Sequence, residues 1–347
     1  MDLLAPVAAQ WREFAQYAAA TSPTYADWCT RVADDREVLA WLERLPRPKR
    51  QPNLVLAAAR LHGVPAPGPY DAFRAALLGD GDPGDPLAAG PVATTVRARR
   101  TQTNEPGRLA TLLPVLAELA RSTVKPLALL ELGASAGLCL HPDRYAYRWS
   151  GEVVGDLAPA VAAGAPQPPV LPCTTSGPVP LPTALPRVAW RGGVDLAPVD
   201  LHDDEAVAWL EALVWPEERE RLARLRAAVA VARAADDAVL VRGDLREQLP
   251  ELVDLAGRHG EVVVLHSAVL AYVEPDDRAE VVAVLEELVG RGACRWVSNE
   301  APGVLPGVAA TGPALPEGST SFVLGLDGRA VAWTHPHGSA LTWLPPR

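Results

Sequence analysis

Apolar residues recur along the chain with two different periods, and the change between them divides it into two regions. Residues 1–78 carry the three-to-four-residue spacing of amphipathic helices, and helices are predicted at 4–15, 35–45 and 53–61. Residues 79–86 are rich in Gly, Asp and Pro, a composition that favours a loop. We therefore expect the N-terminal region to be helical.

From residue 127 onward, short apolar runs alternate with helical stretches. Strands are predicted at 127–132, 188–194, 238–241, 262–266, 294–298, 321–326 and 330–334. A helix is predicted at 109–120, before the first of these strands, and further helices at 206–213, 216–233, 245–257 and 278–290. The alternation is typical of a parallel sheet with covering helices, and Asp327-Gly328 between the last two strands predicts a hairpin.

These patterns suggest two domains. A helical cap that contributes to a substrate region is expected over residues 1–104, and an α/β domain over residues 105–347. Within the second domain, residues 155–187 are rich in Pro and lose the periodicity. We interpret them as an excursion or lid.

Composition narrows the classes of function. The 347 residues are 49% hydrophobic and 21% charged, as in an ordinary globular protein. The formal net charge of -10 argues against a nucleic-acid partner, because phosphate binding needs a basic surface. No apolar run reaches the about 18 to 20 residues that span a bilayer, and the first ten residues lack the basic flank of a secretory signal. We expect a cytoplasmic protein without a nucleic-acid or membrane partner.

Metal chemistry has little support in the sequence. Cys29, Cys139, Cys173 and Cys294 are scattered and form no CxxC pair. His335-Pro336-His337 offers two ligands without a third and is interpreted as a turn. We expect no metal.

Gly133-Ala134-Ser135-Ala136-Gly137 follows the first predicted strand and fits three motifs. As G-x-S-x-G it resembles the nucleophile elbow of hydrolases, although several strands and an oxyanion segment should then precede it. As a dinucleotide loop it has Ser135 where G-x-G-x-x-G requires a glycine. It also resembles the cofactor loop of class I S-adenosylmethionine (SAM) methyltransferases, with Glu131 as the acid on the strand. There, small residues let N–H groups at a helix N-terminus meet the carboxylate of the cofactor.

Acids at the ends of the next two strands favour the third interpretation. Asp195 follows the second strand, where a ribose needs a carboxylate, and Asp244 follows the third, where an adenine amine needs an acceptor. Each acid alone is commonly a helix cap, but open α/β sheets bind ligands at the carboxyl ends of successive strands. We expect SAM, or its product S-adenosylhomocysteine, to contact Glu131, Gly133, Ser135, Gly137, Asp195 and Asp244.

Five stretches carry a more specific resemblance. They are 102–105, Glu131 to Leu140, Asp143 to Tyr147, Arg191 to Asp200 and Trp209 to Glu217. Together they resemble the actinobacterial family catalogued as domain of unknown function 2332. That resemblance implies a Rossmann-like fold similar to class I SAM methyltransferases, with a seven-stranded, mostly parallel sheet and a C-terminal antiparallel hairpin. The chain departs from the family in having Cys139 where Asn is usual, and Pro142 interrupts the helix expected after the loop.

Methyl transfer from a sulfonium needs alignment and at most one general base. His266, at the end of the fourth strand, is the candidate base, and Glu105 and Tyr272 are further catalytic candidates. The alternative for His266 is a core histidine, and Tyr272 could instead pack. The candidate substrate ligands are Gln102, Asn104, Arg108, Asn299 and Glu300. For these residues helix and loop capping is the alternative, with Thr103 or Asn104 as N-cap.

The expected activity is SAM-dependent methylation of a small polar or carboxylated metabolite. An enzyme of the same fold with other chemistry stays open, for example an elimination or ring closure in secondary metabolism together with a partner subunit. A non-catalytic SAM-binding subunit and a serine hydrolase that uses Ser135 are further alternatives. The expected partner is a small-molecule substrate, and a homodimer or heterodimer is left open.

Overall fold

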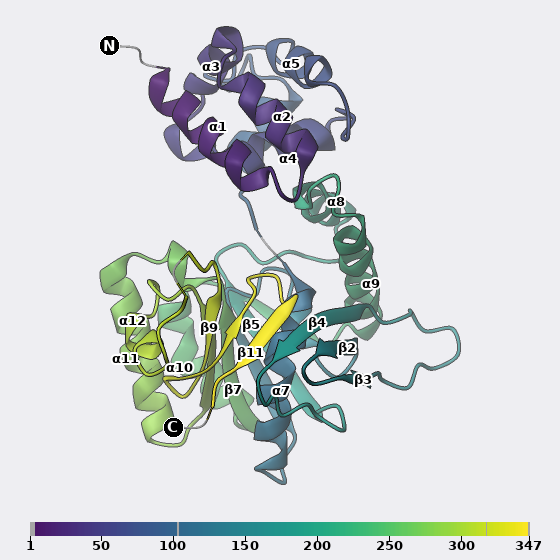
Figure 1. The fold of residues 1–347 in the computed structure, drawn as a ribbon, viewed down its shortest axis with the longest axis vertical. Helices are drawn as coiled ribbons and strands as arrows, with labels where there is room; N and C mark the ends of the chain where they lie inside the picture. The colour runs from purple at the N-terminus through teal and green to yellow at the C-terminus, as the bar shows by residue number, and fades with distance from the viewer. Residues whose placement is uncertain (1–3, 103, 317, 346–347) are drawn as a thin grey trace. The chain divides into compact units, whose positions relative to one another are not determined.

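The computed structural model describes residues 4–102, 104–316 and 318–345, and these fall into two compact units (Figure 1). The first unit consists of Met1–Thr103 and His202–Ala223, and the second of Asn104–Leu201 and Arg224–Arg347. The first unit is therefore discontinuous in sequence, and His202–Ala223 joins it although the sequence pattern places this segment in the second domain. Among the described residues, no helix combines the length and the apolar character that crossing a membrane requires.

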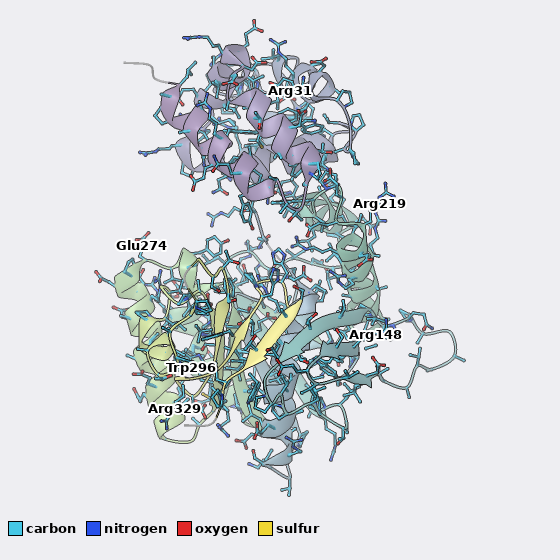
Figure 2. All side chains as sticks on the ribbon, viewed as in Figure 1. Arg31, Arg148, Arg219, Glu274, Trp296 and Arg329 are labelled. Atoms are coloured by element: carbon cyan, nitrogen blue, oxygen red, sulfur yellow. The ribbon has the colours of Figure 1, made fainter. Side chains whose placement is uncertain are left out.

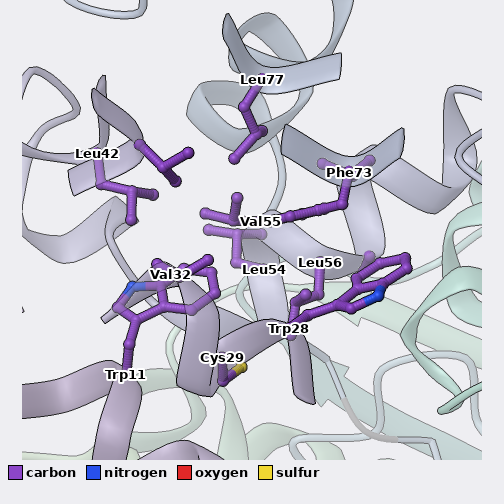
Figure 3. Close-up of a cluster of buried hydrophobic side chains, with 14 of the residues drawn as sticks. Trp11, Trp28, Cys29, Val32, Leu42, Leu54, Val55, Leu56, Phe73 and Leu77 are labelled. Carbon is purple, nitrogen blue, oxygen red and sulfur yellow. The ribbon is translucent and has the colours of Figure 1, made fainter. Parts of the chain in front are cut away.

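The first unit is built from helices around one apolar core. Its elements are α1 (Ala5–Ala18), α2 (Pro23–Val32), α3 (Arg36–Glu43), η1 (Arg47–Lys49), α4 (Pro52–Leu61), α5 (Tyr70–Leu78), α6 (Pro91–Ala98), α8 (Asp204–Leu213) and the start of α9 (Arg219–Ala235). Figure 3 shows Trp11, Trp28 and Phe73 in this core. Trp28 stacks on Phe73 with ring centroids 5.0 Å apart, and its Nε1 donates to the Gly68 carbonyl at 3.0 Å.

Hydrogen bonds fix the returning segment within the first unit. Arg60 of α4 donates to the carbonyl oxygens of Ala212 and Val214 at the end of α8. Trp209 of α8 donates from Nε1 to the Arg100 carbonyl at 3.0 Å, and its side chain is part of the core. The sequence pattern shows α8 as an amphipathic helix, but it does not show that this helix packs on α4.

The second unit contains one mixed sheet with helices. Its strands are β1 (Leu127–Leu132), β2 (Ala146–Gly151), β3 (Gly155–Leu157), β4 (Val170–Ser176), β5 (Val188–Asp195), β6 (Ala238–Arg242), β7 (Glu261–Ser267), β8 (Arg295–Glu300), β9 (Phe322–Leu326), β10 (Arg329–Thr334) and β11 (Ala340–Trp343). Its helices are η2 (Pro106–Arg108), α7 (Leu109–Arg121), the end of α9, η3 (Leu138–Leu140), α10 (Leu245–Ala256), η4 (Leu270–Tyr272), α11 (Pro275–Gly290) and α12 (Pro306–Ala309).

The sheet is larger than the sequence pattern predicts. Its described part has 11 strands in the order β3-β2-β4-β11-β10-β9-β8-β7-β1-β5-β6, so the expected seven-stranded sheet is wrong in its size. The mixed α/β class and the mostly parallel pairing are confirmed, with antiparallel pairs at β8–β9, β9–β10, β10–β11 and β2–β3. All seven predicted strands are present, as β1 and β5 to β10.

Five parallel strands have a doubly wound order. Numbered along the chain, β1, β5, β6, β7 and β8 lie in the order third, second, first, fourth, fifth. This is the order of dinucleotide-binding α/β sheets, and it places the point where the strand order reverses between β1 and β7. Ligands in such sheets bind outside the carboxyl ends of the strands at that reversal.

Both faces of β1 are covered, so all six of its residues are buried. Ala128, Leu130 and Leu132 face the core formed with α10 and α11, which lie on one side of the sheet in Figure 1. α7 is buried along nearly its whole length and packs on β2 and β4, where Trp149 Nε1 donates to the Ala110 carbonyl at 2.9 Å. A helix that is apolar all round is one that other elements enclose.

The Pro-rich excursion contributes two strands to the sheet, β3 and β4, and the sequence pattern predicted neither. Val170–Ser176 forms β4, between β2 and β11, with alternating exposed and buried residues. Pro172 lies inside this strand, and proline argues against an interior strand because it cannot donate to the ladder. The residue that breaks the strand pattern is therefore the reason why β4 was not predicted.

The hairpin at the end of the sheet is confirmed. β9 and β10 pair antiparallel, and Asp327 and Gly328 both have positive φ, 49° and 79°. Positive φ at both central residues is typical of the type I′ turn, whose twist matches that of the flanking strands. The hairpin does not end the sheet, because β11 adds to β10 and then pairs parallel with β4.

A buried ion pair fixes the segment that follows η3. Arg191 of β5 is 2% exposed and donates from Nη2 to both carboxylate oxygens of Asp143, at 2.5 and 2.6 Å. Its Nε donates to Nδ1 of His141 at 3.3 Å, so this imidazole is neutral. Burial, together with Arg191 and Arg144, lowers the pKa of His141 to about 3.

We expect Asp143→Asn to lower the free energy of unfolding by about 3 kcal/mol, because it removes the close carboxylate of the buried Arg191 and leaves, among the described residues, only Asp237, 3.8 Å from its Nε. The matched control is Asp156→Asn on β3, whose partner Arg148 (Figure 2) and own side chain are both largely exposed. That control should change the free energy of unfolding by less than about 1 kcal/mol. Denaturant titration of the three proteins measures both values, and equal losses would contradict the role of this pair.

Candidate functional site

Polar residues gather at one edge of the second unit, where parallel strands end. Glu131 is at the end of β1, Asp195 ends β5, and His266 lies near the end of β7. Asn299 and Glu300 end β8. These strands run in the same direction, so the edge is the ligand-binding edge expected of a doubly wound sheet.

The loop after β1 has a strained, closely packed backbone. Gly133, Ser135 and Gly137 have positive φ values of 66°, 50° and 68°. A Cβ on Gly133 would lie 2.5 Å from the side chain of Val269, in the loop after β7, so only glycine fits there. A positive φ at a residue other than glycine costs free energy and is found mostly where a site requires it.

Asn104, a predicted substrate ligand, binds the backbone of this loop. Its side-chain nitrogen donates to the Ala134 carbonyl, and its oxygen accepts from the Leu138 amide, both at 3.2 Å. Glu105 caps η2 by accepting the Gly107 amide at 2.9 Å. The predicted N-cap at Thr103 or Asn104 is therefore not the one that this structure shows, and Thr103 lies outside the described residues.

No α-helix follows the loop. Gly137 leads directly into the three-residue helix η3, and β2 follows at Ala146. The expectation that the loop presents a helix N-terminus to a carboxylate is therefore wrong, since a single 3-10 turn aligns few N–H groups. His141 and Pro142, which follow η3, lie in the segment that the Arg191–Asp143 pair fixes.

Glu131 is the most unusual group at this edge. It is 7% exposed, and its Oε2 is buried and has no hydrogen-bond partner among the described residues. Burial raises the pKa of Glu131 to about 8, with the Arg108 charge lowering it and the Asp195 charge raising it further. A pKa of about 8 favours the protonated side chain at pH 7, and a further donor or cation beside Glu131 would favour the charged form.

Asp195 and Asp244, the two other acids, differ in the hydrogen bonds that they accept. Asp195 accepts the amides of Ser135 and Ala197, each at 2.8 Å and each through a different oxygen, and it stays partly exposed. Each carboxylate oxygen has a second lone pair for a further donor. Asp244 caps α10 through the Arg246 amide and is also bound by the Arg246 guanidinium, which lowers its pKa.

His266 has no free nitrogen. Nδ1 lies 2.8 Å from Glu300 Oε1, and Nε2 lies 3.0 Å from Nε1 of Trp296, which Figure 2 labels. Because an indole only donates, Nε2 must accept, and the proton of the neutral imidazole lies on Nδ1. His266 is 1% exposed, and this arrangement is that of a core histidine, with a carboxylate and an indole as partners.

The remaining predicted site residues fall into three groups. Asn299 and Glu300 are buried and bonded internally, Asn299 to Ser267 and Thr334 and Glu300 to the amides of Val269 and Leu270. Tyr272 on η4 is 82% exposed, and Gln102 belongs to the first unit.

Arg108 joins two strand ends. Its Nη1 donates to the Ser267 carbonyl after β7 at 2.8 Å, and its Nε to the Pro336 carbonyl after β10 at 2.9 Å. This bridge brings the His335–His337 turn to the edge. Sequence analysis singled out that turn only as a weak metal motif, because the distance of more than 200 residues between Arg108 and Pro336 leaves no local signal.

Two alternative chemistries find little support at this edge. Ser135 shares a positive φ with a nucleophile elbow, but its Oγ is buried and has no hydrogen-bond partner among the described residues, so no base activates it. Within the described part of the chain, no group of three or more His, Cys, Asp or Glu residues could hold a metal ion.

We expect Glu131→Gln to remove a pH dependence of stability. The pKa of Glu131 is raised to about 8, so between about pH 4.5 and pH 8 the unfolded chain is ionised at this residue while the folded chain keeps its proton. Stability should thus fall as pH rises, by about 1.4 kcal/mol per pH unit from this group. In denaturant titrations, the free energy of unfolding of the variant should rise relative to that of the wild type from pH 4.5 to pH 8. Glu118→Gln, at an exposed site on α7, is the control, and parallel curves for all three proteins would contradict the prediction.

Comparison with known proteins adds a family but no activity. No curated protein and no solved structure matches the chain, so the similarity to class I SAM methyltransferases is not confirmed. One family model, described as "Uncharacterized protein conserved in bacteria" (DUF2332), matches residues 8–70 and 88–343, which is nearly the whole chain. The chain therefore belongs to the bacterial family of domain of unknown function 2332.

Proposed function

We propose that the second unit binds SAM at the carboxyl ends of β1 and β5, and that the protein methylates a small polar or carboxylated metabolite. The observation that carries the proposal is Glu131, whose buried Oε2 has no hydrogen-bond partner in the described part of the chain and which lies where the strand order of a doubly wound sheet reverses. A buried polar group without a partner is costly, so a ligand that supplies a donor is favoured there.

The ammonium group of SAM would meet this requirement. A cation beside Glu131 favours its charged form, so binding should drive the proton from the carboxyl group to solvent. The neighbouring Ser135 Oγ is a second buried polar atom without a partner and is able to donate or accept. Both atoms belong to or adjoin the loop that Asn104 and Asp195 hold in place.

Of the other parts of SAM, the ribose has a candidate partner at this edge, whereas the adenine does not. Asp195 is partly exposed and keeps lone pairs for ribose hydroxyls. Asp244 is bound by Arg246, so the proposal does not place adenine on it. When bound, SAM supplies an electrophilic methyl group, and the contribution of the chain is to align the acceptor and to exclude water. His266 is not the base in this proposal, because both of its nitrogens are bonded.

One observation favours a second candidate, an enzyme of the same fold with different chemistry. The loop leads into η3 and not into a helix, so the carboxylate of SAM lacks the helix N-terminus that usually receives it. A ligand without that carboxylate would not lose affinity through the absence of this helix N-terminus. The two candidates share Glu131 and differ in whether a methyl group is transferred.

Calorimetry with SAM and with S-adenosylhomocysteine tests the shared part. At pH 7 we expect binding of both to release close to one proton per site, seen as a binding enthalpy that differs between phosphate and Tris buffers. Glu131→Gln should weaken binding by about tenfold or more and abolish the proton release, because a charged hydrogen bond is lost.

The matched control is Asp244→Asn, which removes a carboxylate at a neighbouring strand end but keeps a good helix cap. Its Kd for SAM should be close to that of the wild type. Folded wild-type protein that binds neither compound would sink the SAM proposal. Binding of both, with no radiolabelled methyl group passing to any component of a cell extract, would favour the second candidate.

A further inference from the structure

The His335-Pro336-His337 turn lies at the same edge as the candidate site. β10 pairs antiparallel with β9, which pairs antiparallel with β8, so β10 runs in the direction of β8. Its last residue, Thr334, donates to Asn299 Oδ1 at 2.6 Å, and Asn299 in turn donates to Ser267 at the end of β7. His335 follows Thr334 directly and is exposed.

The turn is held rigidly against η2. Arg108 donates to the Pro336 carbonyl, and a Cβ on Gly338 would lie 2.0 Å from the Gly107 carbonyl oxygen. Gly338 has a φ of 80°, which glycine adopts without strain. Such close contact between two backbones holds the turn beside η2, and the charge of Glu105 at the start of η2 acts on the His335 ring.

Hydrogen bonding determines the tautomer of His335. The amide of His337 donates to His335 Nδ1 at 3.1 Å, so Nδ1 carries a lone pair and the proton of the neutral imidazole is on Nε2. Nε2 has no hydrogen-bond partner among the described residues. His335 therefore presents a free N–H donor at this edge, in contrast to His266.

The surroundings keep this imidazole neutral. Partial burial lowers the pKa of His335, and the Glu105 carboxylate acts in the opposite direction. The other charged or titratable groups beside the turn are the Arg108 guanidinium, bonded to Pro336, and the His337 ring, whose centroid is 5.7 Å from that of His335. Protonation of Nδ1 would also break the bond from the His337 amide.

We propose that His335 is a substrate-binding residue, whose Nε2–H donates to a carbonyl or carboxylate oxygen of the small molecule bound at this edge. The inference rests on the proposed function in taking the edge as a substrate site, but it does not require that the cofactor be SAM. A neutral imidazole donor polarises a carbonyl oxygen but keeps its proton, because losing that proton would leave a high-energy imidazolate. The Arg108 guanidinium of η2, bonded to the Pro336 carbonyl, places a positive charge beside this turn.

The experiment uses ¹⁵N-histidine-labelled full-length protein and pyruvate, which has both a keto and a carboxylate oxygen, as the probe. Ring ¹⁵N spectra at pH 7 should show His335 as the Nε2–H tautomer, assigned from the signal missing in His335→Leu. Pyruvate should shift the His335 and His337 rings in a saturable way, whereas methylammonium should not.

Two substitutions separate a donor from mere packing. His335→Leu should weaken pyruvate binding by about tenfold, measured on the His337 ring, because the hydrogen bond to a charged acceptor is lost. His335→Gln keeps an N–H group near the position of Nε2 and should restore most of the affinity. Spectra of all other histidine rings report whether each variant is folded.

An Nδ1–H tautomer, rings that pyruvate does not move, or equal binding by the Leu variant would each overturn the inference. Its failure is distinct from failure of the proposed function. His335→Gln and His335→Leu should leave the Kd for SAM unchanged, since His335 has no part in holding the cofactor. Pyruvate binding without SAM binding would support His335 as a substrate ligand and contradict the proposed methyltransferase. SAM binding without pyruvate binding would support the cofactor site and contradict the role of His335.

Discussion

The site depends on one constraint, that β1 is buried on both faces. It pairs with β5 on one side and β7 on the other, and all six of its residues are buried. Such a strand tolerates polar side chains only near its end, where the sheet meets solvent or a ligand. Glu131 occupies this position, and burial there raises its pKa to about 8. Its Oε2 has no hydrogen-bond partner among the residues that the structure describes, and only the charge of Arg108 favours its ionised form.

Most other polar side chains at this edge serve the backbone. Asn104 bonds two groups of the loop after β1, Asp195 accepts two amides, and Glu300 accepts the amides of Val269 and Leu270. These bonds satisfy loops that would otherwise bury unpaired N–H and C=O groups. They also make the edge rigid, as a binding site requires if its few remaining polar atoms are to meet a ligand in one geometry.

The extension of the sheet beyond β8 brings distant residues to the site. β9 and β10 reverse direction twice, so the end of β10 returns to the edge at which β8 ends. β11 and β4 continue the sheet, and Arg108 bonds the ends of β7 and β10 across it. An α/β core with the order of a dinucleotide-binding sheet thus acquires a histidine turn, which distinguishes this chain from a plain doubly wound domain.

The sequence by itself determined the elements with strong local patterns. The apolar run of β1, the alternation that follows it and the Asp327-Gly328 turn specify their own structure, because burial and backbone preference act over a few residues. It also indicated where Glu131 would lie, since a strand end is a local feature. It did not reveal β4, whose Pro172 contradicts a strand and lies in the part of β4 that pairs with β2, before the pairing with β11 begins at Thr174. Nor did it show that His266 is bonded at both nitrogens while His335 is left with a free donor. Which polar groups keep a free hydrogen-bonding atom is decided by partners tens to hundreds of residues away, and only the tertiary structure brings those partners into contact.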